Sequence, residues 1–342
     1  MEKQPSFNTI IGGTKQQREE LQDYALERSQ ESGEELFGEY LVQPTEHERK
    51  TIQEAVKYAN DIALSYGSKR KIDSKRIFIL KPRSVKELTK GELKNAKANS
   101  IQQSIAVDRV ESDAILAKTI VHEVFHLSSY QSAQISTSGK DKPYRDGIEM
   151  VGRQQEEGSY FSVAQEALIA ILSKRFFDDV ISKDPLYGED LRNTPMIKAW
   201  LSAYVEKRTI NENEKREIQE EIENTLIFPQ TQKLCEELNK VGEDDDKKFK
   251  FFQNHYAETD LSTLQRERTE EVRMFDKVLD DIMLKSNGLI SDRQKLFDEF
   301  ARAHFSGNYV PLARMIEDIL GQGSFRKIAI ELGQVDTTVP KA

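Results

Sequence analysis

Hydrophobic residues recur at helical spacing in two stretches of the N-terminal half of the chain. The first stretch follows Thr45 and Glu48, which have the spacing of a capping box, and ends at Gly67. The second begins at Asp113. Both patterns predict helices with one buried face. The apolar positions are Ile52, Ala55, Val56, Ala59, Ile62, Ala63 and Tyr66 in the first stretch, and Leu116, Ala117, Ile120, Val121, Val124 and Leu127 in the second.

Shorter apolar runs predict strands and further helices around these two. Residues 76–80 (RIFIL) predict a buried strand, and residues 100–110 predict a half-exposed strand because apolar and polar positions alternate there. Ser84 is expected to open a short helix with its own capping box. Residues 144–151 predict a strand, and residues 162–180 predict a strongly apolar helix.

These elements together predict an α+β protein in three parts. Residues 1–44 are polar and predict an N-terminal tail with one helix. Residues 45–184 predict a core of helices and a small sheet. Residues 185–342 predict a mainly α-helical C-terminal lobe.

Composition narrows the classes of function. Of the 342 residues, 37% are hydrophobic and 32% are charged, which predicts a soluble protein without a membrane partner. The N-terminus has no apolar core of signal-peptide length, and the single cysteine, Cys235, suits a reducing, cytoplasmic compartment. A formal net charge of -9 argues against a nucleic-acid partner. These features leave the oligomeric state open.

The second predicted helix contains the sequence KTIVHEVFHLSSY at residues 118–130, which includes an HExxH pattern. Residues four apart lie on the same face of a helix, so His122 and His126 can direct both imidazoles at one Zn²⁺ ion. Glu123 is rotated from His122 by about 100° and can flank the metal and hold a water molecule. This arrangement is typical of zinc-dependent hydrolysis.

A catalytic zinc ion needs a third protein ligand, and the other histidines do not continue the HExxH pattern. Three glutamates are candidates. Glu156 and Glu157 lie in a predicted exposed turn, whereas Glu166 lies about one turn into the apolar helix at 162–180. Because a ligand is held better on a rigid element, Glu166 is the favoured third ligand.

The order of strand, HExxH helix, loop and glutamate-bearing helix resembles that of the small gluzincin-type zinc metallopeptidases over about residues 45–180. The resemblance implies a zincin-like core in which His122, His126 and Glu166 bind zinc and Glu123 is the catalytic base. It also likens the strand at 100–110 to an edge strand that pairs with an extended peptide.

The chain departs from the gluzincin pattern one turn after the ligand glutamate. Many gluzincins have a carboxylate there that orients a zinc-bound histidine, whereas this chain has Ala170. The partner of the histidines is therefore unassigned. The side chain that stabilises the transition state is also unassigned, and the candidates are Tyr144, Tyr160, Tyr187, Tyr204, His255 and His304.

The sequence therefore predicts a zinc-dependent metallopeptidase that acts on a peptide or protein substrate. The alternative is a zincin-like scaffold that binds a protein partner without cleaving it. Glu123 separates the two hypotheses, because a scaffold has little need for the base. Its presence favours the enzyme.

Overall fold

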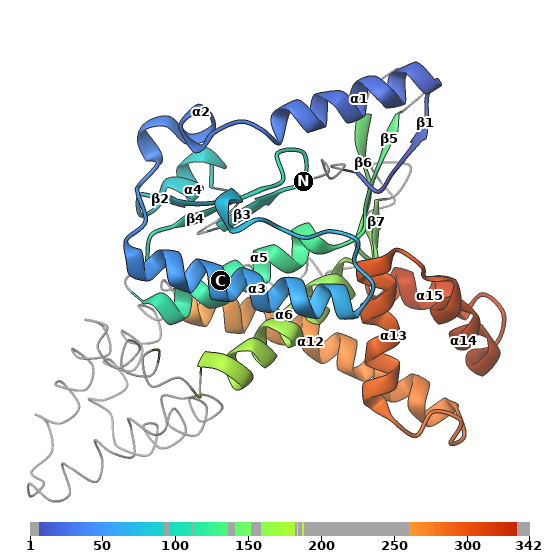
Figure 1. Ribbon diagram of the computed structural model, residues 1–342. Coiled ribbons are helices and arrows are strands. Elements are labelled where there is room, and N and C mark those ends of the chain that lie inside the picture. Colours follow the sequence, from blue (N-terminus) through green and yellow to red (C-terminus); the bar gives the residue numbers. More distant parts are fainter. Residues whose placement is uncertain are drawn as a thin grey trace, which may run out of the picture.

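The computed structural model describes residues 7–91, 93, 96–110, 112–135, 141–151, 159–181, 183, 187 and 260–333. These residues form a mixed arrangement of helices and two small sheets, compatible with the predicted α+β class (Figure 1). Before the HExxH helix the elements are β1 (Thr9–Gly12), α1 (Lys15–Arg28), α2 (Gly33–Phe37), η1 (Gly38–Tyr40), α3 (Glu46–Ser65), η2 (Ser74–Arg76), β2 (Ile77–Leu80), α4 (Ser84–Leu88), β3 (Ala96–Asn99) and β4 (Ser104–Asp108).

The HExxH helix is α5, which spans Asp113–Ser128 and begins at the predicted residue. The elements that follow it are β5 (Gln131–Ile135), β6 (Asp141–Asp146), β7 (Glu149–Val151), β8 (Ser159–Tyr160), α6 (Ser162–Phe176), a π-helical turn η4 (Phe177–Ile181), α12 (Asp260–Lys285), α13 (Arg293–Ser306), α14 (Val310–Leu320) and α15 (Ser324–Glu331). The helical prediction for the C-terminal part is thus confirmed over the described residues, and the domain boundaries themselves stay a prediction.

The helix predicted from Thr45 is confirmed as α3. The Thr45 hydroxyl accepts a hydrogen bond from the Glu48 N–H, and the Glu48 carboxylate accepts one from the Thr45 N–H. At the other end Gly67 has a φ of 92°, and the next residue, Ser68, donates its N–H to the Ala63 carbonyl. Glycine adopts this left-handed conformation without strain, so the helix stops where the sequence places Gly67.

The helix at Ser84 also forms, but the expected capping box does not. Arg83 precedes the helix with a φ of 69° and makes no side-chain cap. The Val85 N–H instead donates to the Asp108 carboxylate at 2.9 Å, from the end of β4. A tertiary contact therefore replaces the local cap, and it holds α4 against the three-stranded sheet.

That sheet has the order β2-β4-β3, with β2 parallel and β3 antiparallel to β4. The prediction of a half-exposed strand over 100–110 was wrong, since all five residues of β4 are buried. Ile105 and Val107 face the main core, while Ala106 packs in a smaller cluster with Val85 of α4. Both faces of β4 are covered, so its alternation does not mark a solvent face. The edges of the sheet are β2, which residues 40–42 partly cover, and β3, which the sequence analysis missed.

The second sheet has the order β1-β5-β6-β7-β8. The single strand expected at 144–151 is instead a hairpin of β6 and β7 that turns at Gly147, where φ is 57°. Residues 7–44 are more than the predicted polar tail with one helix. They contain β1, which pairs in parallel with β5, and α1, whose Leu21 and Ala25 are buried against that sheet (Figure 1).

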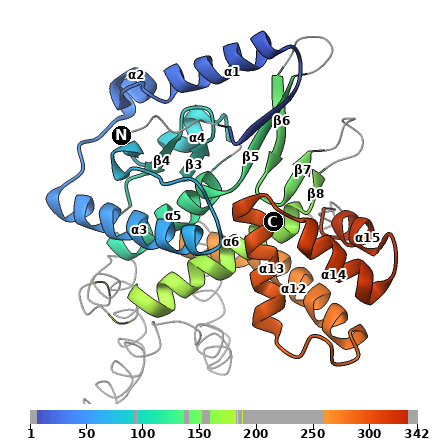
Figure 2. The same cartoon turned by 45° about the vertical axis from the view of Figure 1, so that its right-hand side comes forward.

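The main core lies between the three-stranded sheet and the helices. Helices α3, α5, α6 and α12 stack below the sheet, while α13 to α15 lie at one end of the stack (Figures 1 and 2). One apolar cluster runs from Ile105 of β4 through Ile120 of α5 and Leu168 of α6 to Phe300 of α13. The C-terminal helices thus share the core that surrounds the HExxH helix, so substitutions in them are expected to affect it.

Candidate metal centre

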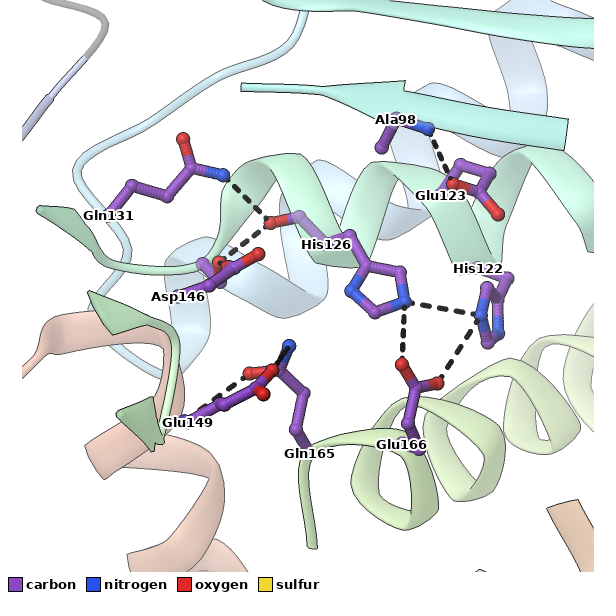
Figure 3. A network of polar contacts seen from close by, with 10 residues as sticks. Ala98, His122, Glu123, His126, Gln131, Asp146, Glu149, Gln165 and Glu166 are labelled. Carbon is purple, nitrogen blue, oxygen red and sulfur yellow. Dashed lines mark hydrogen bonds and ion pairs between the residues drawn. The ribbon is translucent and has the colours of Figure 1, made fainter. Parts of the chain in front are cut away.

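The structure brings the two motif histidines and Glu166 together. His122 and His126 point from α5 toward Glu166 on α6 (Figure 3). The two histidine Nε2 atoms are 3.3 Å apart. The Glu166 carboxylate oxygens lie 3.9 Å from Nε2 of His122 and 3.7 Å from Nε2 of His126. The favoured third ligand therefore lies near both imidazoles, whereas Glu156 and Glu157 lie outside the described residues.

These separations suit a tetrahedral metal ion. Zinc–nitrogen bonds of about 2.0–2.1 Å require ligand atoms about 3.3–3.4 Å apart in a tetrahedron. The two imidazole nitrogens already have that spacing. Each imidazole nitrogen lies within about 0.6 Å of that spacing from one of the two Glu166 carboxylate oxygens. One nitrogen from each histidine and one oxygen from Glu166, all within 4.8 Å of one another, could hold a metal ion and leave a fourth position for water or substrate.

Helix α5 is fixed at both ends. At its N-terminus the Ser112 hydroxyl accepts a hydrogen bond from the Ile115 N–H. At its C-terminus the buried Arg70 guanidinium donates to the Leu127 carbonyl at 3.3 Å, and the Ser68 hydroxyl donates to the Ser128 carbonyl at 2.6 Å. A cation at a helix C-terminus also interacts favourably with the negative end of the helix dipole. The last turn, which carries His126, is therefore held by side chains from the α3–β2 connection.

Helix α6 is anchored by the C-terminal part of the chain. The Val163 N–H donates to the Leu332 carbonyl at 2.7 Å, and the Phe161 N–H donates to the Ala329 carbonyl at 3.0 Å. These bonds satisfy N–H groups at the helix start that have no partner within the helix. Glu166 lies one turn further on, so residues about 160 positions away in sequence fix the start of the helix that carries it.

Glu123 lies on a different side of α5, which faces the edge strand β3 (Figure 3). Its carboxylate accepts a hydrogen bond of 2.8 Å from the backbone N–H of Ala98. The predicted rotation of Glu123 away from the histidine face agrees with this placement. The Ala98 N–H is a positioning group that sequence analysis missed, since any residue except proline supplies a backbone donor.

Two acidic side chains, Asp146 and Glu149, lie on the β6–β7 side of the cluster of His122, His126 and Glu166 (Figure 3). Asp146 accepts a hydrogen bond from the Ser129 hydroxyl at 2.6 Å, and that hydroxyl also lies 2.6 Å from the His126 carbonyl oxygen. Burial raises the pKa of Asp146, and the positive field of His126 opposes this increase. Burial likewise raises the pKa of Glu149, and the negative charge of Glu166 raises it further.

Asp146 lies at the end of α5 that carries His126, although Ala170 leaves the gluzincin position for such a carboxylate empty. It belongs to β6 and approaches through the β6–β7 hairpin, so it does not lie at a fixed helical spacing from Glu166 in the sequence. The only local signal in the sequence is an Asp followed by the turn residue Gly147.

The candidates for a transition-state stabiliser receive different placements. His304 is fully buried in α13, and burial lowers its pKa to about 3, so it is a neutral core residue. The Tyr187 hydroxyl donates to Glu54 at 2.7 Å, and Tyr160 packs against the main core. Tyr144 lies half-buried on β6. The remaining two, Tyr204 and His255, lie outside the described residues.

Comparison with protein-family models, curated proteins and solved structures finds no match for this chain. Among the described residues, no helix is long and apolar enough to cross a membrane.

Proposed function

We propose that this protein is a zinc-dependent metallopeptidase with a zincin-like core. The observation that supports the proposal most strongly is the meeting of His122, His126 and Glu166 from two helices at distances close to those of a tetrahedral site. The order of elements supports it as well. A three-stranded sheet with an antiparallel edge strand comes before the HExxH helix, and the glutamate helix comes after it.

The proposed roles follow from the positions of the side chains. His122, His126 and Glu166 would hold the metal ion. A bound zinc ion supplies Lewis acidity, which lowers the pKa of water and polarises a carbonyl group. Glu123 accepts the proton of the attacking water and returns it to the leaving amine. The Ala98 N–H holds one carboxylate oxygen of Glu123 in place and so orients the group that would accept that proton.

The test combines metal analysis with an assay of hydrolysis. The purified protein should contain about one zinc ion per chain, because three protein ligands hold zinc tightly. It should cleave an unstructured protein such as casein, lose this activity to a chelator, and recover it when zinc is restored. Protein that is free of metal after gentle purification would contradict the proposal. Stoichiometric zinc without cleavage would favour the scaffold that binds a partner.

A further inference from the structure

Basic residues are concentrated in one segment of this acidic chain. Residues 69–97 contain eleven Lys and Arg residues but only three Asp and Glu residues, although the whole chain has a net charge of -9. The remainder of the chain is therefore even more acidic than the total suggests. Such an asymmetry indicates a local surface with an electrostatic preference of its own.

Five of these basic residues are exposed on α4, beside it and on the edge strand. Among the described residues, none of the five forms a salt bridge. Glu87, the acidic residue of α4, instead accepts a hydrogen bond from the Tyr40 hydroxyl at 2.9 Å. We call this surface the α4–β3 basic strip, and its members are Lys81, Arg83, Lys86, Lys90 and Lys97.

The strip borders the edge strand on the face of the sheet opposite α5. Lys97 of β3 pairs with Ala106 of β4, whose side chain packs in one cluster with Val85 of α4. Side chains of paired residues in adjacent strands lie on the same face, so Lys97 lies on the α4 side. Helix α4 contacts β4 of this sheet, and both general views place it on the side of the sheet away from α5 (Figures 1 and 2).

The next residue of β3 connects the strip to the proposed active site. Ala98 donates its N–H to Glu123, and β3 has no strand on its other side within the described part of the chain. An extended peptide that pairs with β3 would pass Glu123. Its side chains would alternate between the metal side and the basic strip.

We propose that the α4–β3 basic strip selects acidic peptide segments as substrates, which bind in extended form along β3. This inference rests on the proposed peptidase function and adds the substrate class. Carboxylates at every second position of such a peptide would meet the exposed lysines, whose charges have no partner within the described residues. The position of the strip beside an edge strand favours a peptide over a nucleic acid, which strand pairing does not recognise.

Binding can be measured without turnover in the Glu123→Gln background. The probe is a fluorescent peptide of about twelve residues with Glu at alternating positions, compared with the same peptide carrying Gln instead. The acidic peptide should bind at least about tenfold more tightly, and raising the salt concentration should weaken its binding. Adding Lys86→Gln, Lys90→Gln and Lys97→Gln should reduce its affinity by about tenfold.

A matched control changes three exposed lysines of the C-terminal helices, Lys277, Lys295 and Lys327, to Gln. The control should leave peptide binding unchanged. Equal affinity for the two peptides, or equal effects of the two triple variants, would overturn the inference. Tighter binding of a single-stranded DNA oligonucleotide than of the acidic peptide would overturn it as well.

Cleavage by the protein with Glu123 intact separates the two proposals. Faster cleavage of the acidic peptide, lost in the strip variant and kept in the control, would support both. Binding of the acidic peptide through the strip without cleavage would contradict the peptidase while supporting the acidic-peptide site. Cleavage of casein that depends on Glu123 but not on the strip would support the peptidase and overturn the substrate class.

Discussion

Two sides of helix α5 differ in how the fold supports them. The side that faces α6 carries His122 and His126. Glu166, which lies near both histidines, belongs to α6, and the carbonyls of Ala329 and Leu332 accept hydrogen bonds from the start of that helix. The side that faces β3 carries Glu123, whose carboxylate is held by the backbone N–H of Ala98.

Under the proposed function, binding a metal ion and transferring a proton depend on different parts of the molecule. The metal group requires two helices to keep their relative position to within about 0.5 Å, so the fold secures it with buried packing and helix anchors. The base requires one oriented carboxylate, for which one backbone donor suffices. Substitutions on the two sides should therefore have separable effects.

The largest effect is expected from removing one of the three proposed metal ligands. His126→Ala should lose most of the bound zinc and all measurable hydrolysis, since two protein ligands hold zinc much more weakly than three. Glu166→Ala should lower zinc affinity by at least about a hundredfold. Titration with a competing chelator measures both affinities, with Glu156→Ala and Glu157→Ala as controls. Equal losses in Glu166→Ala and the two controls would refute Glu166 as the third ligand.

The second-largest effect is expected from changing Glu123, the proposed base on the side of α5 that faces β3. Glu123→Gln keeps the size of the side chain but cannot accept the proton, so hydrolysis should fall by about a hundredfold or more. Its zinc content and its unfolding midpoint should stay close to those of the unchanged protein. Parallel measurement of zinc and kcat tests the comparison. Undiminished hydrolysis in this variant would show that Glu123 is not the base.

The pH dependence of the free energy of unfolding tests the burial of His304, which lies close enough to His126 to be affected by its charge. His304 is buried in neutral form, and burial holds its pKa near about 3, below the usual value of 6.5. A lowered pKa stabilises the fold fully above about pH 6.5, and this contribution is lost as the pH falls toward 3. By about pH 5 the loss should reach about 2 kcal/mol in the free energy of unfolding.

Urea unfolding of the unchanged protein and of His304→Gln at the two pH values measures this contribution. Gln can still accept the hydrogen bond that the Ile148 N–H donates to the histidine Nδ1 at 3.3 Å, but it does not titrate. The difference between the two proteins cancels the opposite contributions of Asp146 and Glu149, whose pKa values are raised. If the free energy of unfolding changed with pH equally in the two proteins, the pKa of His304 would not differ between the folded and unfolded states as expected.

The smallest effect should come from the backbone donor on the base side. Ala98→Pro removes the N–H that orients Glu123, and proline is tolerated on an edge strand where no ladder bond is lost. We expect kcat to fall by about tenfold with KM and zinc content nearly unchanged. Ala98→Gly keeps the donor and serves as the control. If both substitutions reduced kcat equally, the effect would come from the strand and not from the hydrogen bond.

Local sequence determined the helices and the approach of the two histidines. Thr45, Glu48 and Gly67 bound α3 through contacts that span only a few residues. His122 and His126 share a face because the helical repeat alone places residues four apart together. Both predictions depend on short-range geometry, and both agree with the structure.

Only the tertiary structure decided which elements meet these helices. It covers both faces of β4 and places β3 at an edge of the three-stranded sheet. It supplies Asp108 as the cap of α4 and brings Asp146 to the end of α5 through a hairpin. It also placed Glu166 within 4 Å of both histidines and fixed its helix with residues near the other end of the chain. These contacts join residues far apart in sequence, so they depend on how the whole core packs and leave no periodic signal in the sequence.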